Sequence, residues 1–588
     1  MNRNPINRNH GIIYVTLILI SLIYLLVTPI GVDMPFHVMR IGELGNELAR
    51  GGAFPVYMFR DLYSYYGYPI PLFYCSVLLY PFALLTICGV SALTAYKLMV
   101  LCVMWMIYGI SHACISRIKG FDTISTECAF IYTIQPFVLN ELFVRSSIGS
   151  AAVFVFVPIV MLGLYYMWHC NNSDMSRFNM ISGVLCLGGG MAMIIMSHVI
   201  SAFLLLFLVA VIVILCLAKC HNRLNMVIFV LAGAFVCILL SSWYVFPVIE
   251  QFADQTYKSQ TVTWLQIGAE NPVSILIPMH LITLVSHLMN TDLRISEIGG
   301  APVPVLIMTI YLFRCGRIFE LKKQERIILV TYYILCVILF IPFIWDRLGY
   351  ILGFMQFGWR IFLIITLVGC AFTIICIKHH SDDSPFVHTI TSIYIASSVY
   401  VLIFMFGYFA IRNMAPDLIG NTVGHAVDKF VYAAETDDDL YIPDGMDEDE
   451  LIERERTVYL ISETDITSDS FEYSYELDTH SGAVDVYISR NQSNEVVKLE
   501  IPFIYYKGYE AVNTDTDVKY EVKKGANNMV NIEIDPGETG HIIIKYQNTI
   551  TQSVTFLISI TSFGILIIIQ LLMRFVHCAY NTPYLKEK

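Results

Sequence analysis

The chain has few charged residues and no cysteine pattern of the kind that holds a metal ion or a disulfide framework. Only 14% of its 588 residues are charged, whereas soluble globular proteins average about 25%. Its 15 cysteines lie almost entirely in or beside apolar runs, with none between residues 412 and 552 and no C-x-x-C motif. These absences exclude an ordinary soluble domain and argue against a structural zinc site or a disulfide-rich scaffold.

The N-terminus also lacks the small-residue cleavage site of a secretory signal peptide. The first apolar run follows Arg3 and Arg8 and ends at Ile30-Gly31-Val32, which is a poor cleavage site. We therefore interpret this run as a retained membrane anchor. Because 56% of the residues are hydrophobic and several runs reach the roughly 20 residues that a bilayer requires, we predict a polytopic membrane protein.

The apolar runs predict an all-α membrane domain of about twelve spans. Short cytoplasmic loops are enriched in Lys and Arg, so the basic loop at residues 314–326 places both termini in the cytoplasm. The predicted spans lie near residues 11–30, 94–115, 123–141, 148–168, 180–197, 199–217, 226–247, 301–313, 327–345, 360–377, 387–411 and 551–573.

Residues 69–89 decide this orientation. They are apolar enough to span, but a span here would move the basic loop at 314–326 to the outer side. Pro69, Pro71 and Pro81 also interrupt the run. We therefore expect juxtamembrane or re-entrant helices on the outer face, where non-spanning backbone must be covered by protein or line a cavity. A second such segment is expected at Val273–Met289.

From residue 412 the composition changes completely. Residues 412–550 contain 29 acidic and 11 basic side chains, and the acids concentrate at 435–455. Such a charge run is typical of a solvated linker, and calcium binding is less favoured because the EF-hand ligand pattern is absent. The predicted units are a membrane domain at 1–411, an acidic linker at 412–456, an extracytoplasmic β-rich domain at 457–550, and a last span with a cytoplasmic tail at 551–588.

The predicted β-rich domain shows short alternating strands. Turn sequences separate them at Ser481-Gly482, Lys524-Gly525 and Asp535-Pro536-Gly537. Several short strands at this spacing suggest a small β-sandwich. Because the segment carries no nucleophile or metal signature, we expect it to act as a binding or structural lid.

The most informative residues follow the first span directly. Asp33, His37 and Arg40 are spaced i, i+4 and i+7, so in a helix they share one face. This places an acid, an imidazole and a guanidinium where lipid meets the outer solvent, as chemistry on a lipid-linked substrate requires. The alternative is that Asp33 only caps the following helix and His37 faces solvent.

The second outer loop supplies Glu141 and Arg145. Ionisable groups near the membrane are costly and usually functional. The two residues form either a simple i, i+4 ion pair or a phosphate site, since a guanidinium forks onto phosphate oxygens. The tyrosines of the first loop, at 63–74, either stack on sugar rings or form an interfacial belt.

Two further outer positions carry candidate residues. His198 lies at the turn between two apolar runs. Arg360 begins a later span, where it either snorkels to the membrane interface or binds a lipid head group together with Gln356 and Trp359.

Several of these segments together resemble a family of bacterial polytopic membrane proteins labelled "6-pyruvoyl-tetrahydropterin synthase-related", although nothing here resembles a soluble pterin enzyme. The segments cover nearly the whole chain, and their order carries the resemblance. They are Asp33–Ile41, Tyr66–Tyr74, Tyr96-Lys97, Arg145 with Pro158, Ser197-His198, Gln356–Arg360 and Ile501–Tyr509.

That family is similar to a branch of the GT-C superfamily of integral-membrane glycosyltransferases. The resemblance implies a GT-C-like fold, a polyprenyl-phosphate sugar as donor, and transfer on the non-cytoplasmic side. It also implies Asp33 as the general base, with Glu141 as a second acid. Many superfamily members have paired acids after the first span, whereas Met34 follows Asp33 here. A divalent cation, Mg²⁺ or Mn²⁺, therefore stays open as a cofactor.

The chemistry of inverting sugar transfer agrees with this set of residues. It needs a carboxylate near the acceptor hydroxyl and positive charge on the departing lipid phosphate. Asp33 would serve the first requirement. The residues expected to bind substrate are His37, Arg40, Arg145, His198, Gln356, Trp359 and Arg360.

We therefore expect a multi-pass plasma-membrane hexosyl- or pentosyltransferase that acts on a lipid, polysaccharide or protein acceptor of the envelope. Membrane lipids are expected partners and nucleic acid is not. The alternatives are a transporter or flippase for an envelope lipid or polysaccharide and a non-catalytic envelope assembly protein. Transporters usually carry charges at the bilayer midplane and have matching halves, and the sequence shows neither, which favours the enzyme.

Overall fold

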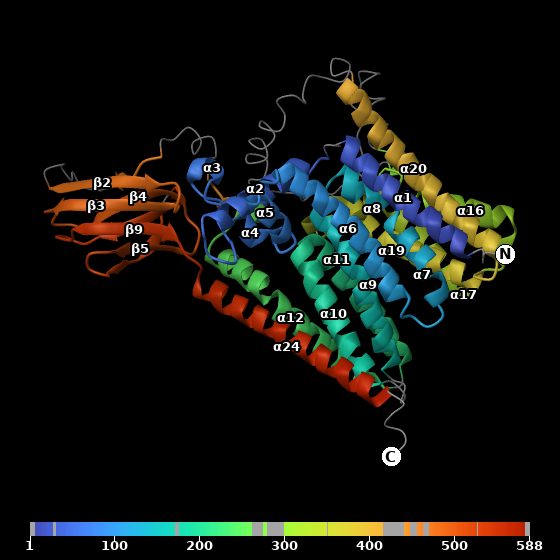
Figure 1. Cartoon of the computed structure of the whole chain (residues 1–588). Coiled ribbons are helices and arrows are strands. Elements are labelled where there is room, and N and C mark those ends of the chain that lie inside the picture. Colours follow the sequence, from blue (N-terminus) through green and yellow to red (C-terminus); the bar gives the residue numbers. More distant parts are fainter. Residues whose placement is uncertain are drawn as a thin grey trace.

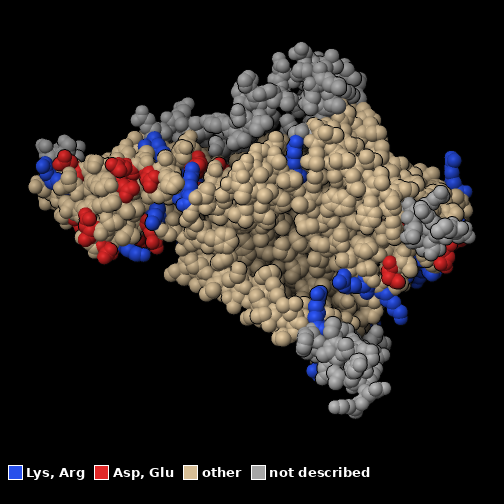
Figure 2. Space-filling model, viewed as in Figure 1, with Lys and Arg blue, Asp and Glu red and all other residues tan. Residues whose placement is uncertain are grey.

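A computed structural model describes residues 6–27, 31–170, 176–220, 222–261, 275–278, 281, 299–349, 351–414, 440–446, 456–461, 470–525 and 527–581. The described chain is mostly helical, with a β-sheet region near its C-terminus (Figure 1). Nine of the described helices are long and apolar enough to cross a membrane, or ten if one bent pair counts as a span. In Figure 2 a broad uncharged surface covers the bundle, and many of the charged side chains lie over the strands. The chain is a multi-pass membrane protein.

The long helices form one bundle. Within it α10 packs between α9 and α12, and α24 lies along α12 (Figure 1). The α12–α24 contact includes a hydrogen bond of 2.8 Å between the hydroxyls of Ser242 and Ser559. The helices are α1 (Ile6–Val27), α6 (Ala92–Ile115), α9 (Ile148–His169), α10 (Arg177–Ser197), α11 (Val199–Lys219), α12 (Arg223–Asp254), α19 (Phe362–His379), α20 (Ser384–Met414) and α24 (Ile550–Asn581).

Three of the twelve predicted spans are not single long helices. The run at 123–141 is divided into α7 (Ser125–Thr133) and α8 (Pro136–Leu139), because Pro136 cannot continue the hydrogen-bond pattern of α7. The run at 327–345 bends by 79° between α17 (Lys323–Ile338) and α18 (Pro342–Leu348). The third, α16 (Val303–Arg314), has 12 residues, which is too short to cross a bilayer alone.

Two of the long helices contain a proline in their interior, and a tyrosine hydroxyl compensates for each. Proline has no N–H to donate to the carbonyl four residues earlier. In α9, Pro158 leaves the carbonyl of Phe154 without its helical partner, and that carbonyl accepts a hydrogen bond of 2.9 Å from the Tyr132 hydroxyl. In α12, the Tyr57 hydroxyl reaches the carbonyl left by Pro247 in the same way, at 2.7 Å. Each tyrosine thereby ties a long helix to a neighbouring segment.

Short helices follow the first span. They are α2 (Met34–Ala49), α3 (Leu62–Tyr65), α4 (Ile70–Phe73) and α5 (Tyr80–Ile87). Residues 69–89 thus form α4 and α5 instead of one span, as their prolines predict. The helix α2 packs against α5 and α6, and it approaches α5 so closely that a Cβ on Gly45 would lie 2.0 Å from the Thr86 hydroxyl. Most of the second predicted re-entrant segment, 273–289, lies outside the described residues.

The C-terminal region forms two antiparallel sheets. One has the strand order β1-β4-β8-β7 and the other β2-β3-β9-β5-β6. The predicted acidic run at 435–455 lies mostly outside the described residues. The strands are β1 (Tyr459–Ile461), β2 (Phe471–Asp478), β3 (Ala483–Asn491), β4 (Val497–Ile504), β5 (Tyr509–Asn513), β6 (Lys519–Tyr520), β7 (Val522–Lys524), β8 (Met529–Ile534) and β9 (Gly540–Tyr546).

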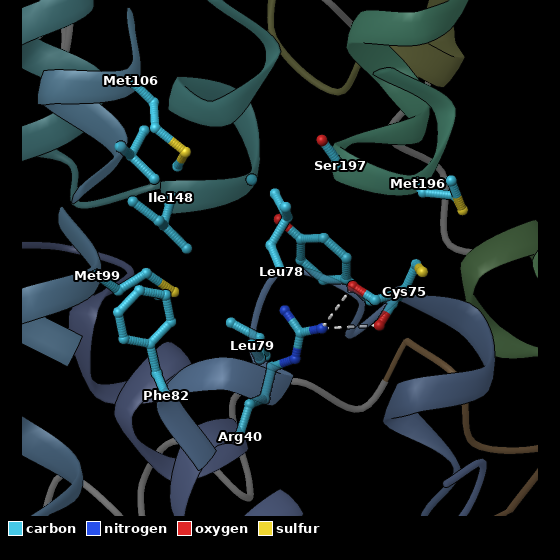
Figure 3. A pocket seen from close by; sticks show the side chains of 13 residues that line it. Arg40, Cys75, Leu78, Leu79, Phe82, Met99, Met106, Ile148, Met196 and Ser197 are labelled. Atoms are coloured by element: carbon cyan, nitrogen blue, oxygen red, sulfur yellow. Dashed lines mark hydrogen bonds between the residues drawn. The ribbon is translucent and has the colours of Figure 1, made fainter. Parts of the chain in front are cut away.

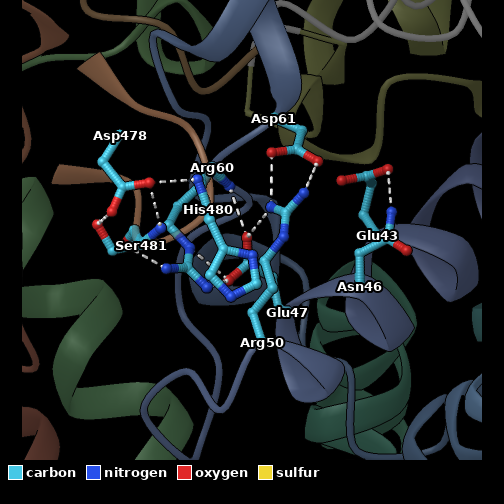
Figure 4. A network of polar contacts seen from close by, with 9 residues as sticks. All are labelled: Glu43, Asn46, Glu47, Arg50, Arg60, Asp61, Asp478, His480 and Ser481. Carbon is cyan, nitrogen blue, oxygen red and sulfur yellow. Dashed lines mark hydrogen bonds and ion pairs between the residues drawn. The ribbon is translucent and has the colours of Figure 1, made fainter. Parts of the chain in front are cut away.

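The strands dock on the short helices through an ion-pair network at the end of α2 (Figure 4). Glu47 is 3% exposed and accepts a hydrogen bond of 2.7 Å from Nε of Arg60. Arg60 also donates to the carbonyl of Ser481 in the turn between β2 and β3. Beside it, Arg50 and Asp61 form two bonds of 2.6 Å. This network joins α2 to the β-sheet region.

Candidate functional site

The start of α2 carries the acid and the imidazole that the sequence singles out. The Asp33 backbone N–H donates to the Arg145 carbonyl at 2.8 Å, and the Asp33 carboxylate makes no capping hydrogen bond to the helix. His37 is 1% exposed. The interpretation that Asp33 only caps the helix and that His37 faces solvent is therefore wrong.

Arg145 joins both predicted acids. Its Nη2 lies 3.3 Å from Oδ2 of Asp33, and its Nη1 lies 3.2 Å from Oε1 of Glu141. The Asp33 side chain is 29% exposed, whereas the Glu141 side chain is 1% exposed. The guanidinium of Arg145 also stands 4.4 Å from the ring centre of Trp359, within cation–π range. Asp33 is thus the accessible acid of the pair, and Glu141 is the buried one.

Arg360 forms a second group of polar contacts at the start of the α19 span. Its Nη2 donates to Gln356 at 2.6 Å, and its Nη1 lies 3.2 Å from Nε2 of His198. His198 sits at the break between α10 and α11, where its Nδ1 lies 3.2 Å from the backbone nitrogen of Ser201 and 2.8 Å from the Ser201 hydroxyl. A guanidinium only donates, so Nε2 of His198 accepts the hydrogen bond from Arg360 when Nδ1 carries the ring proton. This contact joins the start of the α19 span to the α10–α11 break.

Arg40 forms the third group and is 1% exposed. Its Nη2 donates to the carbonyls of Tyr74 at 2.7 Å and Cys75 at 3.2 Å (Figure 3). Its Nη1 lies 3.4 Å from Nδ1 of His37, and its guanidinium lies 4.0 Å from the ring centre of Tyr74. Tyr74 also contacts the His198 ring edge-on, with 6.3 Å between the ring centres. Tyr74 therefore connects the Arg40 group to the Arg360 group.

Among the described residues, the cluster holds three arginines, Arg40, Arg145 and Arg360, and two carboxylates, Asp33 and Glu141. Burial and the charges of Arg40 and Arg145 hold the pKa of His37 well below its usual value. Burial and the neighbouring arginines lower the pKa of His198 in the same way. Both imidazoles are therefore neutral at pH 7, and the positive charge of the site resides on its arginines.

Two cavities lined by described residues adjoin this cluster. The first, which we call the arginine cleft, is narrow, at about 40 Å³, and lies between α2, the α4–α5 segment, α6 and α10 (Figure 3). It is lined by Arg40, Tyr74, Cys75, Leu78, Leu79, Phe82, Met99, Val103, Met106, Ile148, Gly149, Met196 and Ser197. The second, which we call the lateral groove, has a volume of about 570 Å³ between α10, α11 and α12, and its lining is almost entirely apolar.

The cluster contains every residue that the sequence nominates for the site. The sequence does not single out Tyr74 from the other first-loop tyrosines, and it misses Gly149. A Cβ on Gly149 would lie 2.1 Å from the Tyr74 hydroxyl and 2.7 Å from the Ser197 carbonyl. Gly149 is therefore the residue that lets Tyr74 and the end of α10 approach α9. No motif marks this position, because the contact joins segments far apart in the chain.

The side chains of the site also bear on whether it can hold a metal ion. Among the described residues, no three or more His, Cys, Asp or Glu side chains are grouped so that they can hold a metal ion. The two acids of the site are instead joined through Arg145. The use of a divalent cation, Mg²⁺ or Mn²⁺, which the sequence leaves open, stays open.

No model of a known protein family matches the chain, and no curated protein sequence matches it. What the chain does is therefore inferred from its own residues.

Proposed function

We propose that the chain is a membrane glycosyltransferase of the GT-C type, which moves a sugar from a polyprenyl-phosphate donor to an envelope acceptor with inversion. One observation carries the proposal. The accessible carboxylate of Asp33 pairs with the guanidinium group of Arg145, in a buried cluster that also holds Arg40 and Arg360 and lies beside apolar cavities. An acid for the acceptor and cations for a lipid phosphate thus occur together.

Asp33 is the proposed general base. Its Oδ2 pairs with Arg145, and within the described residues its Oδ1 has no hydrogen-bond donor. In the reaction Oδ1 takes the proton of the acceptor hydroxyl, the acceptor oxygen bonds to the anomeric carbon, and the bond from that carbon to the phosphate oxygen breaks. Arg145 orients the carboxylate through this contact. Glu141 holds Arg145 from the other side.

Arg360 and His198 are the proposed phosphate ligands. The Arg360 guanidinium and the His198 ring lie 3.2 Å apart, and Arg360 has no carboxylate within 4 Å in the described part of the chain. Preorganised donors of this kind stabilise the charge that develops on a leaving phosphate. The lateral groove begins next to this pair, because Val199 and Ala202 line it and follow His198 on α11. Its apolar lining suits the polyprenyl chain, and its volume is that of a typical ligand pocket.

The proposal includes the orientation of the chain in the membrane. The chain lies in the plasma membrane, with both termini in the cytoplasm and the β-sheet region outside. We propose that its two sheets face one another as a β-sandwich and cover the site as a lid. The charge distribution of the loops supports this orientation.

A lipid transporter is the second candidate, and the lateral groove favours it. An apolar groove beside a cationic cluster also suits the movement of a lipid phosphate without chemistry. A transporter does not need the accessible carboxylate of Asp33, so the role of that carboxylate separates the two candidates.

The test is sugar transfer from radiolabelled polyprenyl-phosphate sugars to crude envelope acceptor by the purified full-length protein. We expect Asp33→Asn to lower the rate about 100-fold or more, as loss of a general base does. Asp383→Asn is the matched control, since Asp383 is also an acid paired with an arginine, Arg317, but lies far from the cluster in the chain. Transfer that survives in Asp33→Asn would contradict the role of Asp33. Absence of transfer from every donor, with lipid binding intact, would favour the transporter.

A further inference from the structure

Two separate apolar cavities reach the polar cluster from different sides of α10. Met196 and Ser197 line the arginine cleft, whereas Ile195 and Val199 line the lateral groove. Between them, Tyr244 of α12 donates a hydrogen bond of 2.7 Å to the Phe73 carbonyl, next to Tyr74 and Cys75 of the cleft. The last turn of α10 and the chain at 73–75 therefore form a wall between the two cavities, and a single lipid chain does not pass from one into the other.

The arginine cleft has the character of a site for an anionic amphiphile. Arg40 and Ser197 contribute polar groups to its lining, and apolar side chains line most of the rest. Met106, on α6, is 38% exposed and marks the side where the cleft meets the surface of the bundle. The cleft therefore joins a cationic group to an apolar wall that faces the surroundings of the bundle.

The walls of the cleft also suit a flexible ligand. Three of the lining residues, Met99, Met106 and Met196, are methionines. Methionine is unbranched and repacks around ligands more readily than other apolar residues. The cleft is narrow in this structure, and these side chains are the ones whose rotation would widen it. The lateral groove needs no such change, because it already has the volume of a ligand site.

We propose that the arginine cleft binds a second membrane lipid, whose anionic head group lies at Arg40, and that this lipid is the acceptor. The inference rests on the proposed glycosyltransferase function and deepens it, since the acceptor becomes a lipid-linked molecule and not a soluble polysaccharide or protein. The donor chain lies in the lateral groove and its phosphate at Arg360. The acceptor enters from the side of α6, so that its hydroxyl reaches Asp33 from the opposite direction.

The atoms balance in this arrangement. The acceptor hydroxyl gives its proton to Asp33 and forms the new bond to the anomeric carbon. The bond between that carbon and the donor phosphate oxygen breaks, and the polyprenyl phosphate leaves toward Arg360 and His198. Both products remain membrane lipids, and each leaves by the cavity through which its precursor entered.

Photolabelling of the full-length protein tests the two sites. The protein is placed in phosphatidylcholine nanodiscs with a diazirine-bearing phosphatidylglycerol or a diazirine-bearing polyprenyl phosphate, and the adducts are mapped by peptide mass spectrometry. Met106→Trp fills the mouth of the cleft, with Leu98→Trp as the control on the same helix, since Leu98 is equally exposed and does not line the cleft. Ala234→Trp fills the lateral groove, with Leu231→Trp as its control on α12.

We expect phosphatidylglycerol adducts on α5 and α6, reduced about tenfold by Met106→Trp, which corresponds to about 1.4 kcal/mol of binding free energy. Polyprenyl-phosphate adducts should fall on α11 and α12 and be reduced by Ala234→Trp alone, while both control variants label like the wild type. Competition of the two lipids for the same adducts, or phosphatidylglycerol adducts outside the cleft only, would overturn the proposal.

Failure of the proposed function gives a different result. If both adduct patterns appear as expected and no sugar is transferred, the two lipid sites stand and the glycosyltransferase assignment is wrong. If sugar is transferred to a water-soluble acceptor and Met106→Trp leaves the rate unchanged, the glycosyltransferase stands and the lipid acceptor is wrong.

Discussion

At the scale of single residues, Asp33 and Glu141 pair with the same arginine, Arg145, but we expect them to have different roles. Glu141 is buried and Asp33 is partly exposed, yet both contact Arg145. Loss of an ion-pair partner is costly for a buried charge, whereas an exposed charge is solvated. The same chemical change, carboxylate to amide, should therefore affect folding at Glu141 and catalysis at Asp33.

We expect Glu141→Gln to lower the stability of the protein by about 3 kcal/mol or more, because Arg145 then keeps a buried charge with a weaker partner. Asp33→Asn should change stability far less. Thermal unfolding of the two purified variants, followed by tryptophan fluorescence in nanodiscs, measures the difference. Equal losses of stability in both variants would show that exposure does not separate the two acids.

The two buried imidazoles predict how stability depends on pH. His37 and His198 have folded-state pKa values well below 6.5, their usual value. Between the folded and the unfolded pKa, the unfolded chain binds more protons than the folded one, so stability falls as the pH drops below about 6.5 and is fully present above it.

Unfolding temperatures measured from pH 7.5 down to pH 5 should show this decrease. His198→Gln should flatten it, because glutamine does not titrate. A decrease that keeps its full slope in both His198→Gln and His37→Gln would assign it to other groups.

At the scale of elements, tyrosine hydroxyls repair the hydrogen-bond gaps that prolines leave in the long helices. Water is scarce in the bilayer, so a carbonyl without a donor costs more there than at a protein surface. In α9 the donor to the freed Phe154 carbonyl is Tyr132 of α7. The Phe154 carbonyl that Pro158 leaves free thus holds the α7–α8 segment against α9, because its hydrogen-bond donor lies on α7.

We expect Tyr132→Phe to destabilise the protein by about 1–3 kcal/mol, since it leaves the Phe154 carbonyl buried without a donor. Pro158→Ala restores the helical N–H for that carbonyl. The double variant should therefore lose less stability than the sum of the two single changes, and a double-mutant cycle of unfolding free energies measures the coupling. Simple additivity would mean that the tyrosine and the proline act independently.

At the scale of the whole molecule, α2 connects the site to the β-sheet region. Its first turn carries His37, and its last turns carry Glu47, which holds Arg60 against the turn between β2 and β3. A helix is a stiff connector, so the position of the strands and the position of the first-turn residues depend on one another.

We expect Arg60→Ala to loosen this joint. Amide hydrogen exchange should rise at residues 57–68 and 478–482, while exchange in α9 and α10 stays as in the wild type. Arg490→Ala is the matched control, because within the described residues the ion pair of Arg490 is an exposed one of 3.9 Å with Glu472 on the strands themselves. Unchanged exchange at 478–482 in Arg60→Ala would show that other contacts hold the strands.

The sequence predicted the membrane class, the short helices at 69–89 and the residues of the cluster, because each has a local sign. Long apolar runs, interrupting prolines and charges beside spans are visible without a structure. The bend before Pro342 and the division at Pro136 were not predicted from the sequence. Both spans were assigned from the length of an apolar run, and that criterion takes no account of a proline near the end of the run. The Glu47–Arg60–Ser481 joint and the contact of Gly149 with Tyr74 were missed for a different reason. They join segments that only the folded chain brings together.

The contact between α12 and α24 has a consequence for how the chain is made. These two helices are neighbours in the bundle, and Ser242 and Ser559 bond across them, yet about 300 residues separate these serines in the sequence. A ribosome therefore delivers α12 to the membrane long before its partner exists. Until α24 is synthesised, the face of α12 that packs on it contacts lipid or an insertion chaperone. The bundle is therefore complete only when synthesis is nearly finished. A messenger RNA truncated anywhere in the β-sheet region would encode a chain without α24. The face of α12 that packs on α24 would then stay uncovered, and quality-control proteases would recognise the chain as incompletely folded.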